Sequence, residues 1–134
     1  MANRQLIGLD VGTARIGVAV ADGSIRIAIP HGTIDVNGDE VKSIAELVVR
    51  NDCDTIVIGY PRNQSGEATE QTRLVEAFAA QLEDLNAKLV FQDESLTSVM
   101  AEQRLQARSQ PYSKGDIDSE AAAIILQDYM EQHL

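Results

Sequence analysis

The sequence contains no tryptophan, one cysteine (Cys53) and three prolines in 134 residues. A single cysteine excludes an internal disulfide bond, and with it the small disulfide-stabilised folds of secreted proteins. Aromatic residues make up 4% of the chain, so we do not expect a platform on which nucleic-acid bases stack. No apolar run approaches the roughly 20 residues of a membrane-spanning helix, and the first residues lack the pattern of a signal peptide. We therefore expect a cytoplasmic protein that has no membrane segment.

Positive charge is scarce as well. The 11 Lys and Arg residues are outnumbered by 21 Asp and Glu residues, which gives a formal net charge of −10. Such a charge does not attract nucleic acid over long distances, so a protein that coats nucleic acid non-specifically is excluded. An acidic protein still binds phosphates where local Arg or Lys residues or divalent cations are present. The charge balance is therefore compatible with a metal-dependent enzyme.

Two apolar runs around a glycine-containing turn dominate residues 5–22. The first run, LIGL, ends at Asp10, the turn contains Gly12 and Thr13, and the second run is IGVAV at residues 16–20. This pattern predicts a β-hairpin whose first strand is covered on both faces of its sheet. Asp10 at the end of that strand needs a partner, solvent or a metal ion, because an isolated charge near a core is unfavourable. A hydrogen bond within its own turn is the alternative role for this carboxylate.

The remaining chain alternates between strand and helix patterns. Pro30 favours an edge strand or a bulge for the third strand, and Asn37 with Glu40 resembles a capping box. The resulting order, β-β-β-α-β-α-β-α-α, predicts an antiparallel meander followed by parallel strands that helices connect. We find no linker or repeat, and expect one domain over residues 1–134. Further strands are expected at residues 26–34, 55–59 and 88–92. Helices are expected at residues 38–50, after residue 67, at 98–108 and from 116–119 onward. The buried stripe of the second helix consists of Leu74, Val75, Phe78, Leu82 and Leu85.

Carboxylates fall at the ends of these predicted elements. Asp10 ends the first strand, Asp93 and Glu94 end the last strand, and Asp116 and Asp118 begin the final helix. Open α/β sheets place their functional sites at the carboxyl ends of parallel strands, so acids from these three segments could converge. Clustered carboxylates repel one another and favour bound cations, and oxygen ligands select Mg²⁺ or Mn²⁺. Two such ions support phosphodiester hydrolysis. Helix capping is the alternative role for Asp116 and Asp118.

Four segments together resemble the YqgF (RuvX) family, the Holliday-junction-resolvase-like proteins that are also described as pre-16S rRNA nucleases. They cover well over half of the chain, in the order and spacing of the family. The segments are LDVGTARIGVAVAD (9–22), IVIGYPRNQSGEATEQTRLVEAFAAQL (56–82), FQDESLTSVMAEQRL (91–105) and KGDIDSEAAAIILQDYM (114–130).

The resemblance implies an α/β, ribonuclease H-like fold in which helices flank a five-stranded mixed sheet. It also implies a cytoplasmic nuclease that depends on Mg²⁺ or Mn²⁺ and acts in maturation of the 5′ end of 16S rRNA. The expected partners are then pre-16S rRNA and ribosomal assembly intermediates. Cleavage of branched DNA, the Holliday-junction activity, is inferred for the family by analogy of fold and is kept as an alternative.

The family motifs assign roles to three acids. Asp10 matches the acid of the first strand, Glu94 that of the D-E-R-x-[ST] motif, and Asp118 that of the final K-G-x-x-D motif. They are the expected catalytic and metal-binding residues, with Asp93 as a neighbouring acid. One position departs from the family, because Ser95 stands where an arginine is usual. The positive charge that would lie beside Glu94 is therefore absent.

The expected substrate-binding residues are Arg15, Arg62, Asn63 and Lys114, which lie in or beside loops at the same edge of the predicted sheet. For Arg15, an ion pair within the hairpin is an equally weighted alternative. No exposed apolar stripe stands out, so we expect a monomer or a weak homodimer.

Two other classes of protein share parts of this pattern. D-x-G-T after an apolar strand also occurs in actin-like ATPases and sugar kinases, but that fold needs two such domains, which 134 residues cannot supply. A non-catalytic RNA-binding factor in ribosome assembly is the second alternative, and Ser95 is the feature that favours it.

Overall fold

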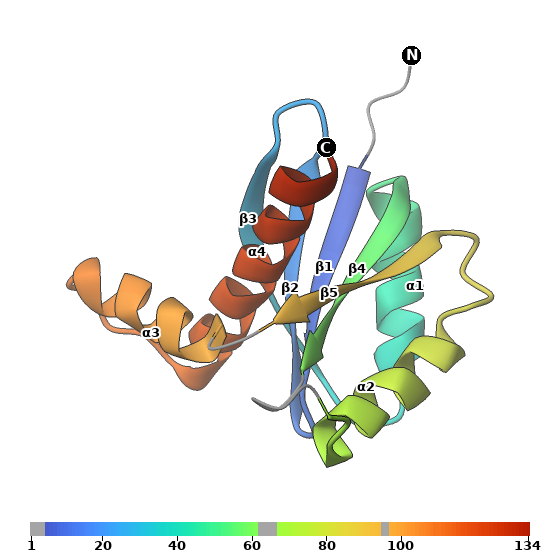
Figure 1. Cartoon of the computed structure of the whole chain (residues 1–134), viewed down its shortest axis with the longest axis horizontal. Helices are drawn as coiled ribbons and strands as arrows, with labels where there is room; N and C mark the ends of the chain where they lie inside the picture. Colours follow the sequence, from blue (N-terminus) through green and yellow to red (C-terminus); the bar gives the residue numbers. More distant parts are fainter. Residues whose placement is uncertain (1–4, 62–66, 95–96) are drawn as a thin grey trace.

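The computed structural model describes residues 5–61, 67–94 and 97–134 (Figure 1). Its elements follow the predicted order of strands and helices. They are β1 (Gln5–Val11), β2 (Arg15–Asp22), β3 (Ile27–Asp35), α1 (Glu40–Arg50), β4 (Cys53–Pro61), α2 (Glu70–Gln81), β5 (Lys88–Glu94), α3 (Thr97–Ala107) and α4 (Lys114–His133).

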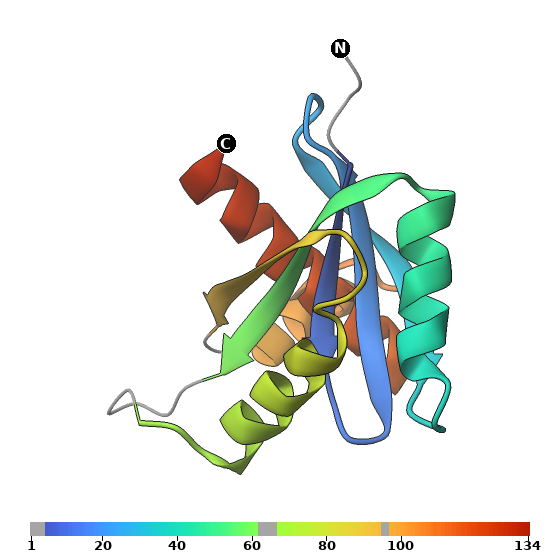
Figure 2. The ribbon, with the colours of Figure 1, turned by 90° about the vertical axis from the view of Figure 1, so that its right-hand side faces the viewer.

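The five strands form one mixed sheet in the order β3-β2-β1-β4-β5. β1 pairs antiparallel with β2, and β2 pairs antiparallel with β3. β1 also pairs with β4, and β4 with β5, in parallel. The helices α1 and α2 lie on one side of the sheet and α4 on the other, with α3 beside α4 (Figures 1 and 2). This arrangement confirms the predicted ribonuclease H-like α/β fold.

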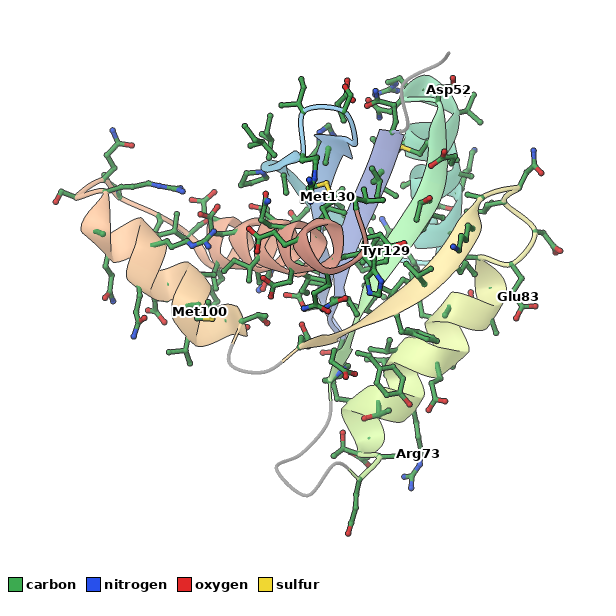
Figure 3. The ribbon with its side chains drawn as sticks, turned by 45° about the horizontal axis from the view of Figure 1, so that its top comes forward. Asp52, Arg73, Glu83, Met100, Tyr129 and Met130 are labelled. Carbon is green, nitrogen blue, oxygen red and sulfur yellow. The ribbon has the colours of Figure 1, made fainter. Side chains whose placement is uncertain are left out.

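Alternation along each strand divides the core between the two faces. On the face of α1 and α2, Ile7 and Leu9 pack in one cluster with Ile44 of α1 and Phe78 of α2. On the opposite face, Leu6, Ala19 and Val57 pack with the buried side of α4, where Figure 3 labels Tyr129 and Met130. Asp10 is four residues after Leu6 on the same strand, so by alternation its side chain also faces α4.

Glycine lets α4 approach the sheet closely. A Cβ atom added to Gly8 would lie 2.8 Å from the Cβ of Leu126 and 3.0 Å from the carbonyl oxygen of Ala122. Both distances are shorter than ordinary van der Waals contact, so a side chain at this position would push the helix away. The helix contacts all five strands, which makes it the element that fixes what lies on this face.

Two predictions for β3 are confirmed. The strand is at the edge of the sheet, and the register between β2 and β3 shifts between Val18 and Ala19, opposite Gly32 and Pro30. Pro30 has no backbone N–H to donate, which explains its place at an irregular position of an edge strand.

Several predicted boundaries differ from the structure. The capping box of Asn37 and Glu40 is wrong, because α1 begins at Glu40 after Asp39. Asn37 instead accepts a hydrogen bond from the N–H of Asp39 (3.0 Å), and Glu40 accepts one from that of Gly38 (2.7 Å). Both side chains therefore satisfy the turn before the helix.

The ends of β4, α2 and α4 also differ. β4 continues through Pro61, α2 ends at Gln81 so that Leu82 and Leu85 of the predicted stripe follow it, and α4 begins at Lys114. The earlier start of α4 results from a capping box between Ser113 and Asp116. Within the described residues, no helix has the length and apolar character needed to cross a membrane.

Candidate active site

Asp10 lies on the central strand with a glycine on each side. It pairs with Gly17 of β2, and the pairing of Leu9 with Ile58 places Gly59 of β4 beside it on the other side. Glycine carries no side chain, so the space above both neighbours is open to other parts of the chain. Each of these two spaces is occupied by a segment that carries another acid.

Gly17 lies directly beneath the backbone of Asp118. A Cβ atom at Gly17 would overlap the carbonyl group of Asp118 and lie 3.0 Å from the N atom of Ser119. The first turns of α4 therefore rest on β2 at this position. The contact places Asp118 next to Asp10, although 108 positions separate them in the sequence.

Gly59 lies beneath the side chain of Glu94. A Cβ atom at Gly59 would lie 2.8 Å from Glu94 Oε2 and 2.6 Å from Ile125 Cδ1. Glu94 is the last residue of β5, and its Oε2 accepts a hydrogen bond of 3.1 Å from the hydroxyl of Thr97 at the start of α3. The carboxylate is thus oriented over β4, toward Asp10.

The electrostatics show that the three carboxylates interact. Burial raises the pKa of Asp10 to about 7, and the neighbouring charges of Glu94 and Asp118 add to this effect. Burial also raises the pKa of Glu94, which the hydrogen bond from Thr97 partly offsets. Positive charge close to such a carboxyl group would stabilise its ionised form and lower its pKa.

Arg15 supplies one positive charge. Its Nε donates a hydrogen bond of 2.9 Å to Asp118 Oδ2, and the side chains of the pair are 35% and 24% exposed. Of the alternatives for Arg15, the structure therefore shows an ion pair, but with α4 rather than within the hairpin. Lys114 is exposed on the first turn of α4, and Arg73 lies on the exposed side of α2 (Figure 3). Arg62, Asn63 and Ser95 lie outside the described residues.

The donor chemistry of the site fits a hard divalent cation, since the carboxylates of Glu94 and Asp118 lie near enough to Asp10 for their charges to raise its pKa. Across residues 5–61, 67–94 and 97–134, however, no group of three or more His, Cys, Asp or Glu side chains is placed so that it could hold a metal ion. Asp118 is engaged by Arg15 instead. The acids are therefore neighbours without forming a completed coordination sphere.

Asp93 does not share the position of Glu94. Val90 packs with the cluster on the α4 face and Leu89 with the cluster on the opposite face. By alternation, Glu94 faces α4 and Asp93 faces away from it. Asp116 is likewise occupied elsewhere, because its carboxylate accepts a hydrogen bond of 2.9 Å from the N–H of Ser113.

Three residues that shape the site have no charge: Gly17, Gly59 and Thr97, of which the sequence indicates Thr97 only as a possible helix cap. Each glycine interrupts an apolar strand, which signals close approach of another segment. Thr97 falls at the [ST] position of the D-E-R-x-[ST] motif, so its place was visible but its contact with Glu94 was not.

Comparisons with known proteins identify the family of this chain. The family model described as RuvX, Holliday junction resolvase, matches residues 4–132. This chain belongs to the RuvX family. The predicted resemblance and the predicted class of enzyme, a nuclease that hydrolyses phosphodiester bonds, are thereby confirmed.

Curated relatives match nearly the whole chain. A protein of Synechocystis sp. is 40% identical over 130 residues, covering 93% of this chain and 86% of its own, and one of Chloroflexus aggregans is 40% identical over 136 residues, covering 98% and 96%. Both are named "Putative pre-16S rRNA nuclease".

Solved structures show the same fold at low sequence identity. RuvC of T. thermophilus in complex with a Holliday junction substrate is 13% identical, with a TM-score of 0.58 over 96% of this chain and 94% of that chain. Fowlpox virus resolvase in complex with Holliday junction DNA is 12% identical, with a TM-score of 0.61 over 97% of this chain and 99% of that one.

Proposed function

We propose that this protein is a divalent-metal-dependent nuclease that hydrolyses RNA phosphodiester bonds during maturation of the 5′ end of pre-16S rRNA in the cytoplasm. The observation that carries the proposal is that Asp10 lies between Gly17 and Gly59, over which the backbone of Asp118 and the carboxylate of Glu94 lie, so that the charges of both acids raise the pKa of Asp10. The names of relatives that are 40% identical support the choice of RNA as substrate.

Asp10, Glu94 and Asp118 would hold Mg²⁺ or Mn²⁺, which when bound activates a water molecule and stabilises the leaving oxygen. The protein supplies their orientation. Asp10 is fixed on the central strand, Thr97 donates a hydrogen bond to Glu94, and the contact with Gly17 fixes the backbone of Asp118. Rigid elements of this kind hold reacting groups at constant separation, which lowers the entropy lost on reaching the transition state.

Substrate contact has to be local, because a net charge of −10 opposes the approach of RNA. Arg15, Lys114, Arg62 and Asn63 are the candidates for contact with the phosphate backbone. Such contacts position a strand without reading its sequence, so we infer modest sequence specificity. Recognition would then come from the shape of pre-16S rRNA in its ribosomal assembly intermediate.

A second candidate function is cleavage of branched DNA. The observation that favours it is the fold shared with two resolvases seen on Holliday junctions, with TM-scores of 0.58 and 0.61. Symmetric cleavage of a four-way junction requires two active sites related by a two-fold axis, and therefore a dimer. A non-catalytic RNA-binding role would instead leave the three acids without a reaction to perform.

One experiment tests the site and the substrate together. The parent protein and the variants Asp10→Asn, Glu94→Gln and Asp118→Asn are incubated with a pre-16S 5′ leader RNA or a four-way DNA junction, with Mg²⁺ or Mn²⁺. We expect metal-dependent cleavage of the RNA by the parent and a loss of at least about 100-fold in each variant. Circular dichroism verifies that the variants are folded.

Asp116→Asn is the matched control, since it makes the same change two positions from Asp118 in a helix-capping residue. It should cleave like the parent. If all three site variants also cleaved like the parent, the assignment of the acids would be wrong. Cleavage of the junction without cleavage of the RNA would favour the resolvase function.

A further inference from the structure

The ion pair between Arg15 and Asp118 joins the first residue of β2 to α4 across 103 positions of the sequence. Its N–O distance is 2.9 Å, and both side chains are partly open to solvent. An ion pair with this exposure is a weak interaction, because water and salt screen it. A divalent cation with several oxygen ligands is able to replace it.

The backbone of Arg15 is held while its side chain is not enclosed. The N–H of Gly12 donates a hydrogen bond of 3.0 Å to the carbonyl oxygen of Arg15, and Arg15 pairs with Asp35 of β3. Only the side chain has to move for the guanidinium to leave Asp118. By alternation, Arg15 lies on the same face of β2 as Gly17, which pairs with Asp10.

The carboxylates require more positive charge than this pair provides. The guanidinium of Arg15 is one positive charge beside three acids. The ion pair that it forms in the structure is with Asp118. In that contact, Oδ2 of Asp118 accepts a hydrogen bond from a guanidinium whose positive charge opposes the approach of a cation. Among the residues that the structure describes, no three or more His, Cys, Asp or Glu side chains are placed so that they could hold a metal ion.

We propose that Arg15 is a resident counter-ion of Asp118 that the divalent cation displaces, and that the released guanidinium then binds a phosphate of the nucleic-acid backbone. The inference rests on the proposed metal-dependent nuclease function. A guanidinium matches the geometry of phosphate through paired N–H donors, so the same side chain serves both partners. Metal binding thereby frees Arg15 for the substrate. The affinity for substrate is therefore lower without bound metal than with it.

The alternative is that Arg15 only ties the hairpin to α4. The two roles predict opposite effects of removing the guanidinium on metal affinity. A structural tie, once removed, loosens Asp118 and weakens metal binding. A displaced counter-ion, once removed, no longer competes for Asp118 and no longer repels the cation, so metal binding becomes tighter.

The first measurement is a calorimetric titration of Mn²⁺, without nucleic acid, into the parent, Arg15→Gln and Arg50→Gln. Arg50 is exposed at the end of α1, on the sheet face opposite α4, so Arg50→Gln corrects for the loss of one positive charge. We expect Arg15→Gln to bind Mn²⁺ about three- to tenfold more tightly than Arg50→Gln. Arg15→Lys, which retains the charge, should bind Mn²⁺ like the parent.

The second measurement is binding of a short single-stranded RNA at saturating Ca²⁺, a cation with the same preference for oxygen ligands. Arg15→Gln should bind this RNA about three- to tenfold more weakly than Arg50→Gln. The slope of log K against log salt should become shallower by about 0.7, as expected for one lost phosphate contact to a single strand. A structural role of Arg15 does not predict that one variant binds Mn²⁺ more tightly and RNA more weakly.

The outcomes separate the two proposals. If the parent binds Mn²⁺ and Asp10→Asn abolishes that binding, but Arg15→Gln binds Mn²⁺ no more tightly than Arg50→Gln, the role of Arg15 is refuted and the metal site stands. If neither the parent nor Arg15→Gln binds Mn²⁺, the proposed metal-dependent function fails, and the role of Arg15 fails with it. Thermal denaturation of each variant confirms that it is folded.

Discussion

Replacement of Gly17 by alanine tests how the sheet positions α4. The new Cβ atom would overlap the carbonyl group of Asp118 and lie 3.0 Å from the N atom of Ser119. Both are backbone atoms within the first turns of a 20-residue helix, so no flexible side chain can move aside. The helix has to shift away from β2, and because α4 contacts every strand, the shift disturbs packing along its length.

The magnitude follows from the type of contact. An extra methyl group in a well-packed interior costs about 1–3 kcal/mol, and we expect about 3 kcal/mol here because the backbone itself has to move. For a chain of 134 residues this corresponds to a fall in Tm of about 10 °C. Asp118 moves together with the helix, so Mn²⁺ affinity should fall as well.

Gly115→Ala is the matched control, because it adds the same methyl group to the same helix–sheet region. The nearest atom to a Cβ at Gly115 would be Thr33 Cγ2 at 3.5 Å, an ordinary contact. Alanine is also favoured over glycine in a helix by about 0.5–1 kcal/mol, so this variant should be slightly more stable than the parent. Urea denaturation measures both changes. A Gly17→Ala protein as stable as the parent would refute the close approach of Asp118 to β2.

Three further predictions concern charge and hydrogen bonding around the site. Because burial and its neighbours raise the pKa of Asp10 from 3.8 to about 7, the folded protein binds a proton there that the unfolded chain releases. The free energy of unfolding in EDTA should therefore fall by on the order of 2 kcal/mol from pH 4 to pH 8. In urea denaturation, Asp10→Asn should remove the part of this slope that Asp10 contributes and leave that of Glu94. Arg108 Nη2 lies 2.6 Å from Oε1 of the buried Glu120, so Arg108→Met should destabilise the fold by about 2 kcal/mol in the same assay, and adding Glu120→Leu should restore the loss. Thr97→Val removes a hydrogen bond that lowers the pKa of Glu94, so the acidic limb of the pH–cleavage profile should move to higher pH.

The element order could be predicted because it follows from periodicity. A window of about ten residues is enough to recognise the apolar runs of β1, β2 and β4 and the apolar stripe of α1. Helix starts were less certain, since Asn37, Asp39 and Ser113 are all suitable caps, and the choice among them depends on the turn that precedes each helix.

Contacts between distant segments could not be predicted from the residues that make them. Arg15 was expected to form an ion pair or to contact substrate, but its partner lies on a helix 103 residues away. Nothing in the pattern near Arg108 indicates that it reaches a carboxylate buried in α4. Such pairs depend on where α4 crosses the sheet. The sequence shows that a glycine interrupts a strand, but not which segment approaches it.

The dependence of the site on α4 has a consequence for the order in which its parts become available during synthesis. Asp10 and Glu94 belong to strands that are translated before residues 114–133, and Asp118 joins them only when that helix has emerged from the ribosome and docked. A nascent chain that has reached β5 therefore carries two of the three acids and no α4 to complete the group. Proteolytic cleavage between Arg108 and Ser113 followed by loss of α4 would have the same effect, so that activity would report on completion of the fold.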